Sequence, residues 1–88
     1  GEYIIYYREK IVGGIYDDRL LVKPVKAAVT YMSENIYEPP YEGAKKMLLV
    51  QEVDSKEFLT GLFNAMYDEL PVPKPKKKNG LHYLTQKL

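Results

Sequence analysis

The stretch EYIIYYREKIVGGIYDDRLLVK, residues 2–23, decides the fold of this chain. It contains two runs rich in β-branched and aromatic residues, 2–7 and 11–16, and such residues suit the pleated surface of a sheet. The polar run REK between them is short, so it predicts a hairpin. A third run, 19–23, ends at Pro24, which has no N–H to donate to a neighbouring strand. We therefore predict three antiparallel strands in a meander.

Gly13 and Gly14, in the second run, raise the question of a phosphate-binding loop. Such a loop places its glycines between a strand and a helix, with a helix N-terminus or a lysine completing the anion site. Here Ile15 and Tyr16 follow directly, and another strand comes after them. We interpret the glycine pair as a β-bulge or as a site where a neighbour approaches the backbone closely.

Asp17 and Asp18 are another candidate site, either for binding a metal ion or for acid–base catalysis. Adjacent side chains point apart in an extended chain, and no third ligand lies at a workable spacing. Aspartate also bonds its own nearby backbone, so the pair predicts a turn. His82, the only histidine, has no nucleophile or carboxylate partner at a recognisable spacing. We therefore expect no enzyme and no bound cofactor or metal.

The middle of the chain adds three more segments. VKAAVTYM (25–32) contains alanines that favour a short helix. SENIYEPPYEG (33–43) predicts a loop, because consecutive prolines forbid helix and disfavour an interior strand. KKMLLVQEV (45–53) predicts a fourth strand.

A helix from about Ser55 to Leu70 is the clearest pattern in the sequence. Asp54, with Glu57 three residues later, is typical of an N-cap and capping box. The apolar residues behind it recur at helical spacing and form one stripe: Phe58, Leu59, Leu62, Phe63, Met66, Tyr67 and Leu70. The sequence therefore predicts an α+β domain, with an antiparallel sheet of about four to five strands and a C-terminal amphipathic helix on one face.

Charge divides the chain into a body, 1–70, and a tail, 71–88. The body holds twelve acidic residues against eight Lys and Arg, a balance of −4, whereas the tail holds five lysines and no acid. PVPKPKKKNG in the tail is typical of a stiff linker, and Leu81, Leu84 and Leu88 after it favour a short helical stripe. The alternative function is weak nucleic-acid binding through the tail and exposed tyrosines. The candidate polyanion contacts are Lys74, Lys76, Lys77 and Lys78.

The composition also bears on the cellular compartment in which the protein works. No run approaches the roughly 18 apolar residues of a membrane helix, so no membrane partner is expected. The absence of cysteine excludes disulfides and thiolate metal sites, which fits a cytoplasmic protein.

Tyrosine is unusually frequent, with nine residues in the chain. Its side chain combines apolar area with a hydroxyl group. Tyrosine is therefore suited both to hydrophobic cores that border on solvent and to protein interfaces. The tyrosines of the meander are therefore candidate interface residues: Tyr3, Tyr6, Tyr7 and Tyr16.

Neither face of the predicted meander is polar. Strict alternation in the second strand puts Ile11 with Ile15 and leaves Val12 on the other side. One amphipathic helix covers only one face of such a sheet, and large exposed apolar patches are rare on monomers. We therefore expect a homo-oligomer, at least a dimer, with a self-complementary contact through the meander.

The body resembles the N-terminal domain of the TfoX/Sxy regulators of bacterial competence genes. The family pattern runs from Gly-x-Tyr through an aliphatic–Tyr strand, a short polar turn and a second apolar strand to Asp-Asp-x-Leu-x-aliphatic-Lys. It fits in register at Gly1, Tyr3, Ile5, Tyr6, Asp17, Asp18, Leu20, Val22 and Lys23. PPYEGAKKMLLVQEV and SKEFLTGLFNAMYDEL resemble the family's later strand and terminal helix.

The resemblance covers about residues 1–70, and the family's leading helix is absent from the sequence. It implies a non-enzymatic domain that acts in transcriptional regulation or protein interaction, with a protein as its partner.

Overall fold

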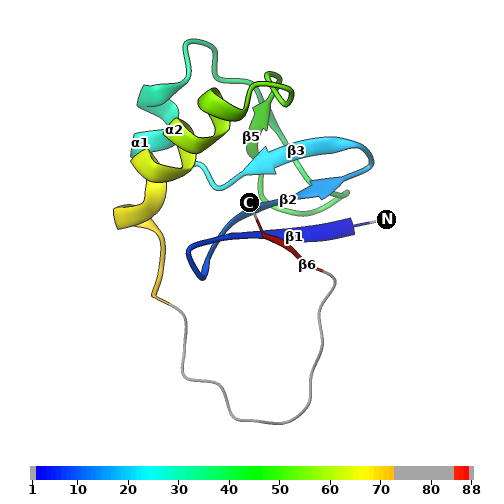
Figure 1. Cartoon of the computed structure of the whole chain (residues 1–88). Helices are drawn as coiled ribbons and strands as arrows, with labels where there is room; N and C mark the ends of the chain where they lie inside the picture. Colours follow the sequence, from blue (N-terminus) through cyan, green and yellow to red (C-terminus); the bar gives the residue numbers. More distant parts are fainter. Residues whose placement is uncertain (1, 73–84, 88) are drawn as a thin grey trace, which may run out of the picture.

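The computed structural model describes residues 2–72 and 85–87, the latter as backbone only (Figure 1). Within them, strands form a six-stranded sheet with the order β4-β5-β3-β2-β1-β6. The elements in chain order are β1 (Glu2–Tyr7), β2 (Lys10–Tyr16), β3 (Arg19–Val22), α1 (Lys26–Tyr31), β4 (Tyr37–Glu38), β5 (Met47–Val50), α2 (Lys56–Met66), the 3-10 helix η1 (Tyr67–Glu69) and β6 (Thr85–Lys87).

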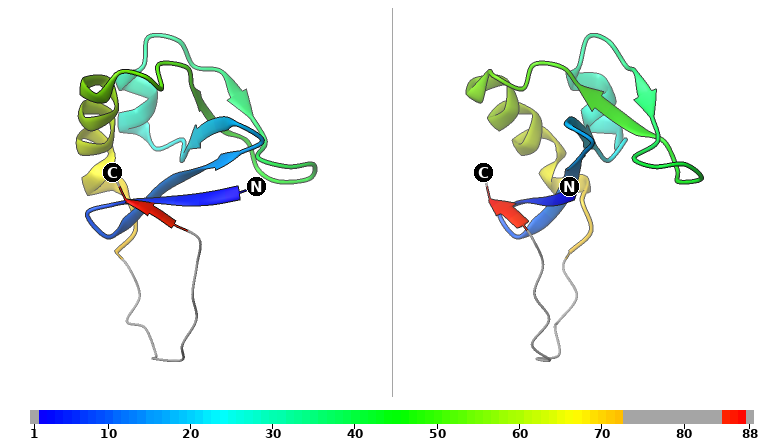
Figure 2. Two further views of the ribbon diagram at one scale, coloured as in Figure 1. Left: turned by 45° about the vertical axis from the view of Figure 1, so that its right-hand side comes forward. Right: turned by 90° about the vertical axis from the view of Figure 1, so that its right-hand side faces the viewer.

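The α+β prediction is confirmed. β1 to β5 pair antiparallel with their neighbours, and β1, β2 and β3 form the predicted meander. Both helices lie on one side of the strands (Figure 2). The sixth strand, β6, pairs with β1 in the parallel direction. Thr85–Lys87 of the tail form this strand, whereas Leu81, Leu84 and Leu88 of the predicted helical stripe lie outside the described residues.

Both hairpins of the meander close through two-residue turns whose residues adopt the left-handed backbone conformation, with positive φ. The φ angles are 50° at Arg8 and 72° at Glu9, and 52° at Asp17 and 63° at Asp18. Such turns match the right-handed twist of the strands that they join. The predicted turn at the aspartate pair is confirmed, and the REK turn has the same geometry.

The glycine pair combines both expected features, a bulge and close backbone approach. Ile5 pairs with Gly13 but the next residue, Tyr6, pairs with Ile11, so Val12 is an extra residue in β2. A side chain at Gly13 would collide with the backbone of β3, at 2.7 Å from the Cα of Val22. The glycines therefore serve the sheet, as predicted.

The bulge overturns the predicted division of β2 between the two faces. Val12 is fully buried and joins the core with the half-buried Ile15, whereas Ile11 lies outside this cluster, opposite Tyr6. We had placed Ile11 with Ile15 by strict alternation. The extra residue breaks that alternation, so the prediction was wrong for Ile11 and Val12.

The helix cap also differs from the prediction by one residue. Ser55, not Asp54, is the N-cap of α2, and its hydroxyl oxygen accepts a hydrogen bond from the N–H of Phe58 at 3.1 Å. The α-helix ends at Met66, and η1 continues the predicted helix to Glu69. Ser55 has an extended backbone (φ −97°, ψ 104°), which is typical of the N-cap position.

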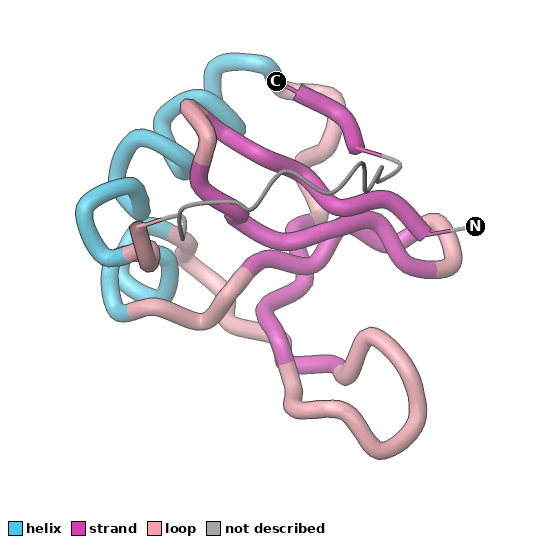
Figure 3. The backbone as a smooth tube through the Cα atoms, turned by 90° about the horizontal axis from the view of Figure 1, so that it is seen from below, coloured by secondary structure: helices cyan, strands magenta, loops and turns pink. Residues whose placement is uncertain are grey.

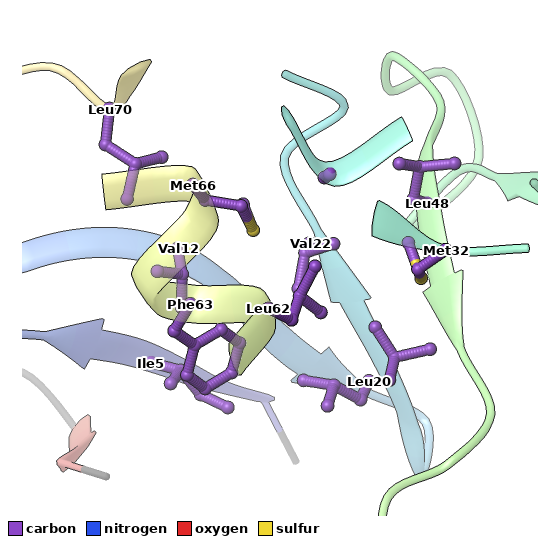
Figure 4. Close-up of a cluster of buried hydrophobic side chains, with 12 residues drawn as sticks. Ile5, Val12, Leu20, Val22, Met32, Leu48, Leu62, Phe63, Met66 and Leu70 are labelled. Atoms are coloured by element: carbon purple, nitrogen blue, oxygen red, sulfur yellow. The ribbon is translucent and has the colours of Figure 1, made fainter. Parts of the chain in front are cut away.

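One hydrophobic core fills the space between the helices and the sheet (Figure 4). The predicted apolar stripe of α2 supplies Leu62, Phe63 and Met66, each no more than 1% exposed. They belong to one cluster with Ile5 and Val12 from the meander. The packing role of the stripe is therefore confirmed.

The middle of the chain follows the predicted order with shorter elements. The predicted strand 45–53 and helix 25–32 correspond to β5 and α1, respectively. The predicted loop 33–43 contains the two-residue strand β4, which pairs with β5.

Candidate interaction surface

The sheet has one face that neither helix covers. The helices lie together on the opposite side of the strands (Figure 3), and the buried side chains of β3 and β5 that join their core are Leu20, Val22, Leu48 and Val50. Because side chains alternate along a strand, the intervening residues point away from the helices. This helix-free face carries Ile4, Tyr6, Ile11, Tyr16, Leu21, Met47 and Leu49.

Tyr16 and Gly14 form the centre of the helix-free face. A Cβ atom at Gly14 would lie 2.9 Å from the Tyr16 ring, so the missing side chain makes room for that ring. Leu21, the cross-strand partner of Gly14, is fully buried although it lies outside the helix-side core. Burial, with the charge of Glu2 and the neighbouring Tyr41, raises the pKa of the Tyr16 hydroxyl.

Arg19 holds the loop after β4 against one corner of the sheet. Its guanidinium lies 2.8 Å from the carboxylate of Glu38 and donates to the carbonyl oxygens of Pro39 and Pro40, at 3.2 and 3.1 Å. Its Nε donates to the carbonyl oxygen of Tyr16 at 3.2 Å. Sequence analysis missed this cluster, because Arg19 and Glu38 are far apart in the chain and neither belongs to a recognisable motif.

The four tyrosines predicted as interface residues divide between the two faces. Tyr6 and Tyr16 lie on the helix-free face, whereas Tyr3 and Tyr7 point to the other side of β1. Tyr7 packs against Phe63 with ring centres 5.6 Å apart, and its hydroxyl donates to Asn64 at 2.6 Å. The structure thus brings Tyr6 and Tyr16 to one surface and uses Tyr7 inside the fold.

The predicted polyanion contacts lie outside the described residues. These are Lys74, Lys76, Lys77 and Lys78.

Two other cations of the body surround one aromatic ring. The Arg8 guanidinium and the Lys10 ammonium lie 4.5 and 4.1 Å from the centre of the Tyr67 ring. The Lys10 ammonium also donates a hydrogen bond to the carbonyl oxygen of Tyr67 at 3.0 Å. The Tyr67 hydroxyl in turn donates to the carbonyl oxygen of Arg8 at 3.2 Å. These contacts tie the first hairpin to η1, so both cations serve the fold.

A small open pocket lies where the end of α1, the end of β5 and the start of α2 meet. Its lining includes the acidic residues Glu34 and Glu52 and the apolar residues Met32, Leu49 and Phe58. No group of three His, Cys, Asp or Glu suited to a metal ion occurs among residues 2–72. No helix in the described part of the chain is both long and apolar enough to cross a membrane.

No protein-family model matches the chain, and no solved structure matches it. The chain is 35% identical over 78 residues to an uncharacterized 12.7 kDa protein in the trpE 5′ region of Spirochaeta aurantia. The match covers 88% of this chain and 68% of the relative. At this identity and coverage, the chain belongs to the same family as the uncharacterized 12.7 kDa protein of Spirochaeta aurantia.

Proposed function

We propose that the chain is a non-enzymatic, TfoX-like domain that works in the cytoplasm by binding protein, in a regulatory role linked to transcription. The resemblance of the meander to the TfoX N-terminal pattern supports the family and the link to transcription. The observation that supports the binding role is the helix-free face, where Tyr6, Ile11 and Tyr16 are only half-buried on a side of the sheet that neither helix covers.

The composition of this face favours a protein partner over a charged ligand. Ile4, Tyr6 and Ile11 are all half-buried and lie close together on β1 and β2. Aromatic and aliphatic side chains of this kind form the centres of protein interfaces. Arg19 does not offer a free charge beside them, because Glu38 and three carbonyl oxygens occupy its guanidinium.

We further propose that the partner is a second copy of the chain, so that the domain is at least a dimer. In a two-fold contact, each copy presents the same apolar surface to the other. The helix-free faces of both copies are therefore removed from water together. Burial of apolar area is the main favourable term in such association.

Substitutions at two tyrosines of β1 test the proposed contact. Tyr6→Glu places a charge on the helix-free face, and Tyr3→Glu places the same charge on the same strand but on the other side. In light scattering, we expect wild type and Tyr3→Glu to exceed the 10.2 kDa of one chain, and Tyr6→Glu to be monomeric. Circular dichroism checks that both variants fold. A wild-type monomer of 10.2 kDa that binds no hydrophobic dye contradicts the proposal.

The alternative function is nucleic-acid binding through the lysine-rich tail. It rests on the sequence contrast between the body, at −4, and the five lysines of the tail. A titration with duplex DNA at two salt concentrations separates the two functions, because binding driven by phosphate contacts weakens steeply as salt rises. Loss of binding when Lys76, Lys77 and Lys78 are changed to Gln would favour the alternative.

A further inference from the structure

The described sheet has two edges, β4 and β6, and the β4 edge is protected by its own residues. β4 is two residues long and is followed at once by Pro39 and Pro40. Prolines have no N–H to donate to another strand, and the Arg19 guanidinium already donates to their carbonyl oxygens. This edge is therefore a poor template for a strand of another molecule.

β1, which lies next to the other edge, has no such protection in its own sequence. It is six residues long, contains no proline, lysine or arginine, and consists of isoleucine and tyrosine after Glu2. These residue types favour strands, and a long apolar edge strand pairs readily with strands of other molecules. β1 would be an exposed edge of the sheet if β6 did not lie beside it.

β6 of the same chain covers this edge. It runs parallel to β1 along residues 4–6 (Figure 2). The pairs are Ile4 with Thr85, Ile5 with Gln86 and Tyr6 with Lys87. The pairing replaces an apolar and aromatic edge of six residues by an edge of three residues with the polar sequence TQK. Very short edge strands are one means by which natural sheets avoid association edge to edge.

We propose that β6 is an intramolecular guard of the sheet: by pairing with β1, it prevents β1 from pairing with the β1 strand of another copy of this chain. Two β1 strands pair antiparallel about a two-fold axis, so one edge suffices for both partners. The guard acts by occupying backbone N–H and C=O groups of β1 that the other copy would use. It is independent of the proposed face contact, because these groups lie in the plane of the sheet.

Release of β6 by substitution tests the guard. Gln86→Pro with Lys87→Pro removes two successive N–H donors, and one of them faces β1 because the donors of a strand alternate in direction. Gln86→Ala with Lys87→Ala keeps both donors and is the matched control. Both pairs are introduced together with Ile11→Glu, which places a charge on the helix-free face from β2 and leaves the sequence of β1 unchanged.

Amide hydrogen exchange at single residues gives the first readout. The N–H groups of β1 point alternately to β2 and to β6. At low protein concentration, we expect the proline variant to lose protection at the amides of residues 4–6 that point to β6, and the alanine control to keep it. Protected amides in α2 of both variants show that the fold is intact. Equal protection of β1 in the two variants would overturn the proposal.

Light scattering over a range of protein concentrations gives the second readout. We expect the average mass of the proline variant to rise with concentration above that of the alanine control, and the lost protection of β1 to return as copies pair edge to edge. Equal masses of the two variants at every concentration overturn the guard. A rise in mass with β1 still unprotected also overturns it, because the copies then associate elsewhere.

The outcome is separable from that of the face contact. Both variants carry Ile11→Glu, so the difference between prolines and alanines reports on the edge alone. If the wild type is a monomer and the proline variant associates through β1, the face contact fails and the guard stands. If the wild type is a dimer, Ile11→Glu makes it monomeric and the prolines behave as the alanines do, the guard fails and the face contact stands.

Discussion

The carboxylate of Glu69 accepts a hydrogen bond from the backbone N–H of Ala27 at 2.8 Å, which joins η1 to the first turn of α1. The residue before α1, Val25, has no side chain that caps the helix. The first N–H groups of a helix have no partner within it, so Glu69 supplies from a distant element what the local sequence lacks.

Replacing Glu69 by Ala should therefore lower the free energy of unfolding by about 1 kcal/mol, the usual value of a lost helix cap. Asp68→Ala is the matched control, because Asp68 is an exposed carboxylate on the same turn. Urea unfolding of both variants provides the comparison. An equal effect of the two substitutions would show that net charge, and not the cap, is responsible.

Phe63 is the largest fully buried side chain on α2, at 1% exposed. Phe63→Ala should lower the free energy of unfolding by about 3–5 kcal/mol, because it leaves a cavity between helix and sheet. Val53→Ala removes apolar atoms from a side chain that is 49% exposed and serves as the control. A loss well under ~1 kcal/mol for Phe63→Ala would mean that the stripe does not support the core.

The positions of the main elements could be predicted from local patterns in the sequence. The runs 2–7 and 11–16 carry the residue types of strands, and the spacing of Leu62, Phe63 and Met66 identified the buried side of α2. These patterns depend on neighbouring residues only, so one sequence is enough to show them.

What the sequence could not predict depends on contacts between distant residues. The bulge at Val12 exists only in the pairing of β2 with β1, and it changed which residues share the helix-free face. Two other contacts join residues from different elements. They are the ion pair between Arg19 and Glu38 and the hydrogen bond from the Ala27 N–H to the Glu69 carboxylate. The location of the candidate surface therefore required the fold, whereas its aromatic character was evident beforehand.

Tyr16 should make stability sensitive to alkaline pH. Burial, the charge of Glu2 and the neighbouring Tyr41 raise its pKa above 10.0 in the folded protein. In the unfolded chain the phenol loses its proton near pH 10. The stabilising contribution is therefore fully present below pH ~10 and is lost as the pH rises through the higher folded value. Tyr16→Phe should flatten the fall in melting temperature above pH ~10, and an unchanged profile would contradict this role.

Two glycines should respond in different ways to the same substitution. A Cβ at Gly13 would meet the backbone of β3, which cannot move without breaking the ladder. Gly13→Ala should therefore cost about 1–3 kcal/mol or more, as overpacking does.

Gly61, inside α2, faces the hydroxyl of Tyr31, a side chain that is 39% exposed and free to turn outward. Alanine is a better helix former by about 1 kcal/mol, which offsets the lost contact of Tyr31 with Phe58. Gly61→Ala should therefore change the free energy of unfolding by less than ~1 kcal/mol. Thermal melts of the two alanine variants compare them, and similar losses at both sites would contradict the argument.

The turn at Arg8 and Glu9 offers the last prediction. Both residues have positive φ, which costs an L-amino acid with a Cβ roughly 1–2 kcal/mol, and two-residue turns of this kind prefer glycine at their second position. Glu9→Gly should raise the free energy of unfolding by about 0.5–1 kcal/mol, after the entropy that glycine loses on folding. Arg8 stays in place in this variant, so its contact with the Tyr67 ring is kept. The comparison is Glu9→Ala, which removes the same charge but keeps the Cβ. If the alanine variant gains as much stability as the glycine variant in urea unfolding, the gain comes from charge, and the strain at Glu9 is not the cause.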